Sequence, residues 1–341
     1  MRLTLKDFQT EALTGLILFF RSAQQASAVN PQAVLLNAPT GSGKTVMATA
    51  MIETLLYGDE DVAGDPGLVF LWLTDQPELN KQTFDKMRAD SSFLAKEQLV
   101  IVDASVDAET LDSGRVYFLN TQKLGSGTSF VRAGDQRTFT LWQTITNTIQ
   151  RDPMRFVLIV DEAHRGTRGK ELLEAETIVQ KFIKGSTSEI TRVPLVLGIS
   201  ATPDRFRDLC NATGRVLWPV EVDPQRVRES GLIKEAVDLY HPDEKQPSDI
   251  TLLIEGIESW DRYRQGWAHY AQAENELVPN PVMLVQVEDA RAGSKESSKT
   301  DLAGVIGTLH KRIAPPPDKP GWIAHAFQDE SELVIGGHTI R

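Results

Sequence analysis

The sequence has little cysteine, no long apolar run and a shortage of positive charge, and each lack excludes a class of protein. Cys210 is the single cysteine in 341 residues, so an internal disulfide is excluded and a reducing cytoplasm fits the chain. No apolar run approaches the roughly 20 residues of a membrane span. The net charge of −11 argues against a protein that coats nucleic acid with positive charge, although it leaves room for a local basic groove.

The sequence gives little support to a secreted protein or to a metal site built from histidines. Residues 12–20 resemble the apolar part of a signal peptide, but Asp7, Gln9 and Glu11 occupy the place of its basic region, so secretion is disfavoured. The histidines beyond residue 240 show no metal-ligand spacing and are interpreted as surface or packing residues. The composition, with 41% hydrophobic and 24% charged residues, is that of an ordinary globular protein long enough for two domains.

The most informative stretch is Ala38-Pro39-Thr40-Gly41-Ser42-Gly43-Lys44-Thr45. It follows the short apolar run at 33–36 and precedes a helical pattern that stops at Gly58. A strand, a glycine-rich turn and a helix form the context of a phosphate-binding loop, in which backbone N–H groups and the helix N-terminus face an anion. Lys44 is then expected to reach the terminal phosphates and Thr45 to ligate Mg²⁺.

The rest of the chain alternates between short apolar strands and helices, which predicts an α/β fold with a parallel sheet covered on both faces. In such sheets, ligands lie beyond the carboxyl ends of the strands. The expected strands are 33–36, 68–73, 99–102, 116–119, 156–160 and 195–199, and the expected helices are 5–23, 77–89, 139–150 and 170–184.

Two polar clusters follow strands of this series. Asp161-Glu162-Ala163-His164 ends the strand at 156–160, where Asp161 is expected to hold Mg²⁺ and Glu162 to orient and deprotonate an attacking water. Ser200-Ala201-Thr202-Pro203 ends the next strand, where its hydroxyls can bond the Asp161/Glu162 turn. Either cluster alone is compatible with an ordinary turn, but their order after the phosphate loop makes them informative.

These motifs, in this order, resemble motifs I, II and III of superfamily 2 helicases and translocases of the DEAH-box kind, over about residues 1–220. The resemblance implies RecA-like folding, binding of ATP and Mg²⁺, and coupling of nucleotide state to movement through His164, Ser200 and Thr202. It implies that Gln9, after Phe8, reads adenine. It also implies that four polar residues meet the nucleic-acid backbone: Thr74, Gln82, Thr121 and Gln122. For these the alternative is an ordinary surface or strand-end role.

The stretches VLIVDEAHRG, SATPDRF and VRESGLIKEAV narrow the likeness to the motor (Res) subunit of type III restriction enzymes and related defence helicases. This resemblance implies a DNA-directed, ATP-driven motor that works with other subunits of a restriction or defence complex. Residues 242–245, Pro-Asp-Glu-Lys, contain the residue types of a nuclease centre. They lack the strand spacing that such a metal site needs, so no nuclease is expected.

The sequence predicts three regions: a RecA-like ATP-binding domain at 1–222, a linker at 223–247, and the start of a second RecA-like domain at 248–341. In the last region we expect helices at 248–276 and 300–312 and strands at 281–287, 322–327 and 333–340. The motifs that carry the arginine finger do not follow, so we expect a truncated chain that binds ATP–Mg²⁺ and turns it over weakly. The alternative function is a nucleotide-responsive binding module for nucleic acid or a partner, without efficient turnover.

Overall fold

The computed structural model describes residues 1–125, 128–131, 137–161, 178–186, 190–233, 249–275, 277, 281–287, 300–313, 333–335 and 338–340. By its internal contacts the chain divides into two compact units, Met1–Val237 and Asp238–Arg341. Within the described ranges, no helix is both long and apolar enough to cross a membrane.

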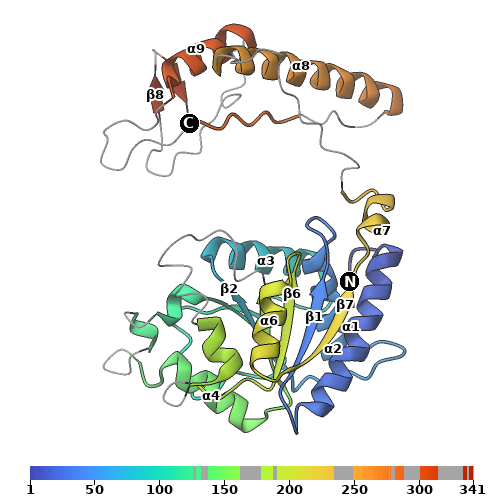
Figure 1. Cartoon of the computed structure of the whole chain (residues 1–341), viewed down its shortest axis with the longest axis vertical. Coiled ribbons are helices and arrows are strands. Elements are labelled where there is room, and N and C mark those ends of the chain that lie inside the picture. Colours follow the sequence, from blue (N-terminus) through green and yellow to red (C-terminus); the bar gives the residue numbers. More distant parts are fainter. Residues whose placement is uncertain are drawn as a thin grey trace. The chain divides into compact units, whose positions relative to one another are not determined.

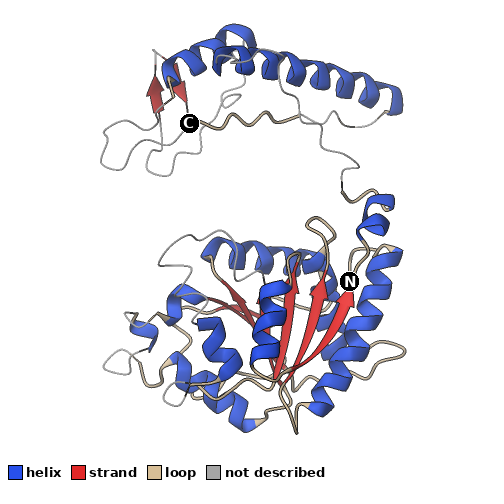
Figure 2. Ribbon diagram, in the orientation of Figure 1, coloured by secondary structure: helices blue, strands red, loops and turns tan. Residues whose placement is uncertain are grey.

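The first unit is built on a sheet of seven parallel strands in the order β3-β4-β2-β5-β6-β1-β7 (Figures 1 and 2). The chain moves away from β1 to the far edge and then returns, which is the doubly wound arrangement expected for a RecA-like α/β fold. The strands are β1 (Gln32–Asn37), β2 (Val69–Thr74), β3 (Leu99–Ile101), β4 (Arg115–Asn120), β5 (Phe156–Asp161), β6 (Leu195–Ser200) and β7 (Val216–Glu221).

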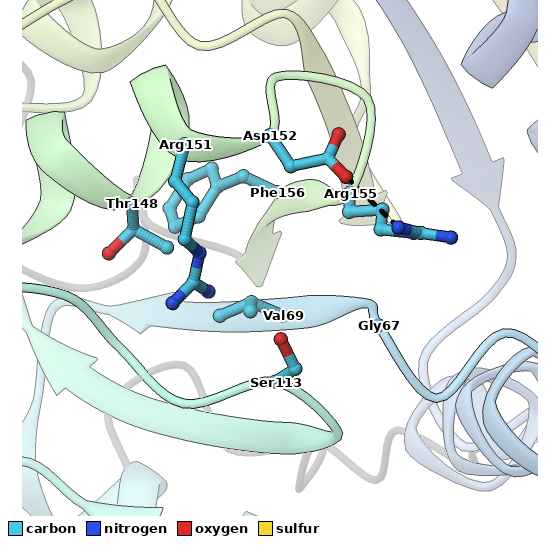
Figure 3. A pocket seen from close by; sticks show the side chains of 8 residues that line it. All are labelled: Gly67, Val69, Ser113, Thr148, Arg151, Asp152, Arg155 and Phe156. Carbon is cyan, nitrogen blue, oxygen red and sulfur yellow. Dashed lines mark hydrogen bonds and ion pairs between the residues drawn. The ribbon is translucent and has the colours of Figure 1, made fainter.

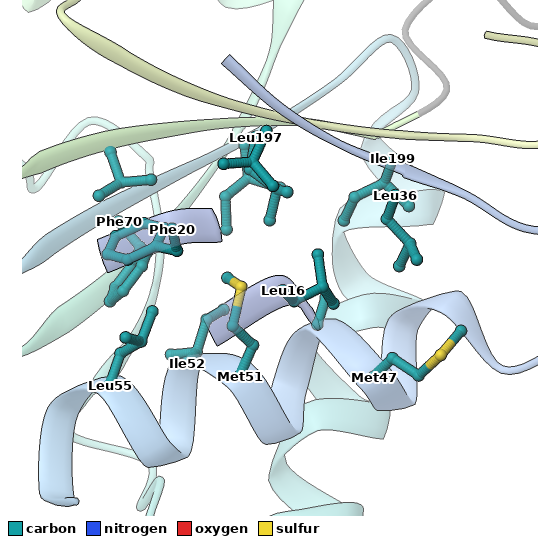
Figure 4. Close-up of a cluster of buried hydrophobic side chains, with 14 of the residues drawn as sticks. Leu16, Phe20, Leu36, Met47, Met51, Ile52, Leu55, Phe70, Leu197 and Ile199 are labelled. Atoms are coloured by element: carbon teal, nitrogen blue, oxygen red, sulfur yellow. The ribbon is translucent and has the colours of Figure 1, made fainter. Parts of the chain in front are cut away.

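Helices cover both faces of the sheet, because successive residues of each strand point to opposite sides. In β1, Val34 and Leu36 join one core cluster, whereas Ala33 and Leu35 join the other. The first cluster is shared with α1 (Asp7–Ala26), α2 (Lys44–Tyr57) and α3 (Pro77–Asp90), and Figure 4 shows its centre. The second is shared with α4 (Leu141–Arg151), the helical residues 178–184 and α6 (Asp204–Ala212).

Local sequence explains where several of these helices begin. Gly43 precedes α2 with a φ of +84°, and Pro77 occupies the first turn of α3. At α4 a reciprocal capping box forms: the Thr140 hydroxyl accepts from the Gln143 N–H, and the Gln143 amide oxygen accepts from the Thr140 N–H. The remaining short elements of this unit are the 3₁₀ turns η1 (Thr121–Leu124) and η2 (Ser129–Val131), and α7 (Pro224–Glu229).

All six strands that the sequence predicts in this unit are confirmed, but the series does not end at β6. Strand β7 pairs with β1 and forms an edge of the sheet. Pro219 interrupts the strand pattern of β7, so the sequence does not predict this strand. Proline is nevertheless tolerated in an edge strand, because one side of that strand forms no ladder hydrogen bonds. Helix α7 lies inside the stretch that the sequence assigns to a linker, and its Val227 is fully buried. The three-region division stays a prediction.

The described part of the second unit contains α8 (Asp249–Glu274), α9 (Leu302–Ile313) and an antiparallel pair, β8 (Leu333–Ile335) with β9 (His338–Ile340). Both helices confirm the expectation. The predicted strand at 281–287 is wrong, because this segment joins no ladder in the described residues. Contacts with the helices hold it instead: Trp260 Nε1 donates to the Pro281 carbonyl at 2.7 Å, and Met283 packs on a small core. The predicted strand at 322–327 lies outside the described residues.

Candidate nucleotide site

The phosphate loop and Asp161 lie at the same rim of the sheet, on either side of β6. In the strand register, Asn37 at the end of β1 pairs with Ser200, and Asp161 at the end of β5 pairs with Ile199. Neighbouring strands are about 4.8 Å apart, so the loop that starts at Ala38 and the Asp161 carboxylate are separated by one intervening strand. The Ala38 N–H also donates to the Ser200 carbonyl at 3.2 Å, which ties the start of the loop to β6.

The loop has the backbone that wrapping an anion requires. Gly41 and Gly43 have φ values of +86° and +84°, a region that favours glycine, and the N-terminus of α2 follows at Lys44. The Lys44 ammonium donates to the carbonyls of Ala38 and Pro39 at 3.3 and 3.4 Å, so it lies along the loop. Thr40 and Gly41 are exposed, whereas Lys44 and Thr45 are half-buried.

The donor set fits a magnesium nucleotide. Among the described residues, the fully buried hydroxyl of Ser42 has no hydrogen-bond partner, which leaves an unsatisfied polar atom inside the loop. Thr45 and Asp161 offer a hydroxyl and a carboxylate, and Mg²⁺ prefers such oxygen ligands, usually one or two from the protein together with phosphate oxygens. The described residues contain no cluster of three or more His, Cys, Asp or Glu that could enclose a metal by itself.

Gln9 contacts the phosphate loop directly. Its amide Nε2 donates to the Ser42 carbonyl at 2.9 Å, and its Oε1 accepts from the Lys6 N–H at 3.0 Å at the start of α1. The side chain is 5% exposed. Because a primary amide has a second hydrogen and a second lone pair, these bonds leave capacity for a base. Its adenine-reading role stays a prediction, but its place beside the loop agrees with it.

Beyond β6, the Ser200 hydroxyl accepts from the Thr202 N–H at 3.0 Å and so shapes the turn that follows. Ser200 is buried and Thr202 is exposed. Glu162 and His164, which the sequence assigns to water activation and coupling, lie outside the described residues. The arrangement therefore unites the phosphate loop, Gln9, Asp161 and Ser200.

The four expected nucleic-acid contacts divide into two kinds. Thr74 is fully buried, with its hydroxyl 2.9 Å from Asn80 Oδ1 and 3.0 Å from the Gln76 carbonyl, and Thr121 is 2% exposed. The buried Thr74 hydroxyl therefore holds the loop that follows β2, and nucleic-acid contact by Thr74 and Thr121 stays a prediction. Gln82 and Gln122 are exposed and stay available.

The structure adds a basic cluster that the sequence reading missed, beyond the carboxyl ends of β3 and β4. Lys123 Nζ and the Arg137 guanidinium lie 5.4 and 5.3 Å from the centre of the Phe130 ring. Lys123 donates to the Val102 carbonyl and Arg137 to the Val106 carbonyl. Burial lowers the pKa of Lys123. Lys123 lies in η1, Phe130 in η2 and Arg137 outside both turns, so only the fold brings these side chains together.

A separate pocket of about 240 Å³ lies at the opposite rim, at the amino ends of β2 and β5 (Figure 3). Its arginines are already engaged. Arg155 Nε pairs with Asp65 at 2.9 Å, and Arg151 donates to the Leu111 carbonyl at 2.8 Å. Ligands of parallel α/β sheets bind beyond the carboxyl ends, so this pocket is not part of the candidate site.

Comparison with known proteins places this geometry in context. A family model described as "Type III restriction enzyme, res subunit" matches residues 2–205. One solved structure that matches is described as "Structure of a nuclease-deletion mutant of the Type ISP restriction-modification enzyme LlaGI in complex with a DNA substrate mimic". It is 14% identical with a TM-score of 0.37, and the match covers 77% of this chain and 22% of that chain, so it carries no argument about function. No curated protein matches the sequence.

Proposed function

We propose, from the premise that this chain belongs to the type III restriction enzyme res subunit family of nucleic-acid motors, that it hydrolyses ATP and couples hydrolysis to movement on DNA. The observation that carries the proposal is the strand register at the carboxyl rim, where β6 is the single strand between the phosphate loop and Asp161. Other subunits of a restriction or defence complex are the partners that the family suggests.

Each residue at the rim has a chemical task in this proposal. The loop N–H groups of 41–45 and the α2 N-terminus bind the phosphates, and Lys44 turns from the loop carbonyls to the terminal phosphates. Thr45 and Asp161 hold Mg²⁺, which neutralises charge on the phosphate oxygens when it is bound. Glu162 orients the attacking water and accepts its proton, and Ser200 passes the state of this turn to Thr202.

Contacts with DNA fall on the same rim, at the β2 and β4 ends. Gln82 and Gln122 are exposed amides that suit phosphate contacts without sequence information. Half-buried Lys123 adds local positive charge beside Gln122, which an acidic chain needs in order to hold a polyanion, whereas Arg137 is 7% exposed and supports the Phe130 ring.

The test is ATP hydrolysis by the protein with duplex DNA, single-stranded DNA, RNA or no nucleic acid. We expect a weak turnover that DNA stimulates, and Lys44→Ala should lower it about 10²-fold or more, because it removes a positioned charge on the phosphates. Lys96→Ala, an exposed lysine before the amino end of β3, is the matched control and should leave turnover unchanged. Turnover that no nucleic acid stimulates would contradict the motor assignment.

Glu162→Gln separates the motor from a binding module without turnover. In a motor, the substitution removes the group that activates water, so turnover is lost while ATP binding remains. In a passive binder, the same substitution leaves both nucleotide and nucleic-acid binding unchanged, and there is no turnover to lose. The two measurements needed are ATP affinity and steady-state phosphate release.

A further inference from the structure

A contact between the phosphate loop and the end of the described part of unit 1 has no assigned role. If a Cβ is added to Gly41, it lies 2.8 Å from Ile233 Cγ2. Ile233 is half-buried and packs against the same core cluster that includes Phe8, one residue before Gln9. The Ile233 side chain therefore rests on the left-handed turn at Gly41, while Gln9 bonds the next residue of the loop, Ser42.

Three features fix Ile233 in this place. Val227 of α7 is fully buried, which anchors that helix to the core. Arg226 of α7 forms a two-point ion pair with Glu11 of α1, with one contact at 2.8 Å, so α7 lies beside the start of α1 (Figure 1). Gly231, with a φ of +76°, then turns the chain back toward the loop.

We propose that Ile233 is a positioning residue for nucleotide binding, which acts through Gly41 of the phosphate loop. The inference rests on the proposed function. The contact requires that residue 41 lacks a Cβ, and the left-handed turn at Gly41 aims the loop N–H groups at phosphate. Ile233 and a bound nucleotide thus stabilise one conformation of the loop, and each strengthens the other.

The contact also has a place in the chain that makes it useful to a motor. The residues after Ile233 join unit 1 to unit 2, which starts at Asp238. Because coupling between two sites is reciprocal, nucleotide bound in the loop stabilises the Ile233 contact at the start of this connection. Nucleotide occupancy is therefore linked by an apolar contact to the position of Ile233.

Titration calorimetry on the full chain tests the proposal, with Mg²⁺ present and with either ADP or inorganic tripolyphosphate as the probe. Ile233→Ala should weaken both by the same factor, about three- to tenfold, because it removes partly buried carbons that support the loop. Ile233→Val should recover most of this loss. Leu232→Ala is the matched control: the neighbouring side chain is 41% exposed, and its removal should leave both affinities unchanged.

Hydrogen exchange supplies a readout that a merely structural role would not change. In the wild type, ADP should slow exchange of the Leu232 and Ile233 amides, and Ile233→Ala should abolish this protection. Unchanged affinities in Ile233→Ala, an equal loss in Leu232→Ala, or a loss confined to ADP would overturn the proposal, the last because it indicates direct contact with the nucleoside. A wild type that binds neither probe would instead refute the proposed function.

Discussion

The described parts of the two units differ in how much apolar surface they bury, and the candidate nucleotide site lies in the part that buries more. Unit 1 packs two extended clusters on opposite faces of its sheet. In the described part of unit 2, one cluster gathers Leu253, Ile257 and Leu309, while Tyr263 and Leu284 are 62% and 91% exposed. A larger structure buries a larger share of its surface, so unit 1 has the means to hold its phosphate loop in one conformation.

The strongest test of this contrast is Phe20→Ala in the first cluster of unit 1. Phe20 is fully buried, so the substitution leaves a cavity and should lower the free energy of unfolding by about 3–5 kcal/mol. Chemical denaturation measures the loss. Phe93→Ala removes an equally large ring that is 59% exposed, and it should change stability by at most about 0.5 kcal/mol. Equal effects of the two would refute the picture of a dense core in unit 1.

The second test concerns a buried cation at the amino ends of β1 and β6. The Arg215 guanidinium donates to the carbonyls of Gln32, Pro194, Ile183 and Val193 at 2.8–3.2 Å. Burial lowers the pKa of Arg215 to about 10, so it stays charged at neutral pH.

Arg215→Met should therefore cost about 3 kcal/mol, because it leaves buried carbonyl groups without a donor. The exposed Arg228→Met serves as the control, and both are compared by thermal or chemical unfolding. A neutral result for Arg215→Met would mean that water replaces the guanidinium.

A smaller effect is expected in unit 2. Leu309→Ala removes a member of the small cluster and should cost roughly 2 kcal/mol, at the lower end of the range for buried leucine, because little surrounds it. The loss should appear as faster hydrogen exchange in α8 and α9. The amides of β1 and β6 should be unaffected, because these strands belong to separate clusters. Faster exchange in those strands would show that the two units unfold together.

The smallest effect is a pH dependence centred on Glu53 of α2. Burial alone would raise its pKa, but hydrogen bonds from the Met1 ammonium, the Ser91 hydroxyl and the Ser92 N–H outweigh it, so the pKa lies below 4.5. A lowered carboxyl pKa contributes stability above about pH 4.5, and this contribution is lost as the pH falls through the lowered value.

Glu53→Gln should accordingly destabilise the protein at pH 7, and the difference from the wild type should shrink as the pH falls below about 4.5. Denaturation curves across this range measure it. Glu60→Gln, an exposed carboxyl in the following loop, should show no such convergence. A difference that is constant with pH would exclude an ionic role for Glu53.

How far the sequence predicts the fold depends on whether a signal is local. The strand at 156–161 has five apolar residues followed by an aspartate, and the phosphate loop has Gly41 and Gly43 on either side of a serine, followed by a lysine. The strand and the loop could each be predicted from their own residues. β7 was missed because Pro219 breaks the pattern and pairing with β1 supplies what local preference lacks. The prediction of a strand at 281–287 was wrong for the opposite reason: its residues favour a strand, but a strand also needs a neighbouring strand to pair with.

By itself, the sequence determined the order and chemical identity of the motifs, because a phosphate loop is specified by glycines, a lysine and a hydroxyl that are consecutive in the chain. Only the tertiary structure decided which side chains meet. It placed Asp161 one strand from the loop, buried Thr74, brought Lys123 and Arg137 to one ring, and set Ile233 on Gly41. Such contacts join residues that are far apart in the chain, so they depend on strand order and packing, which no local pattern contains.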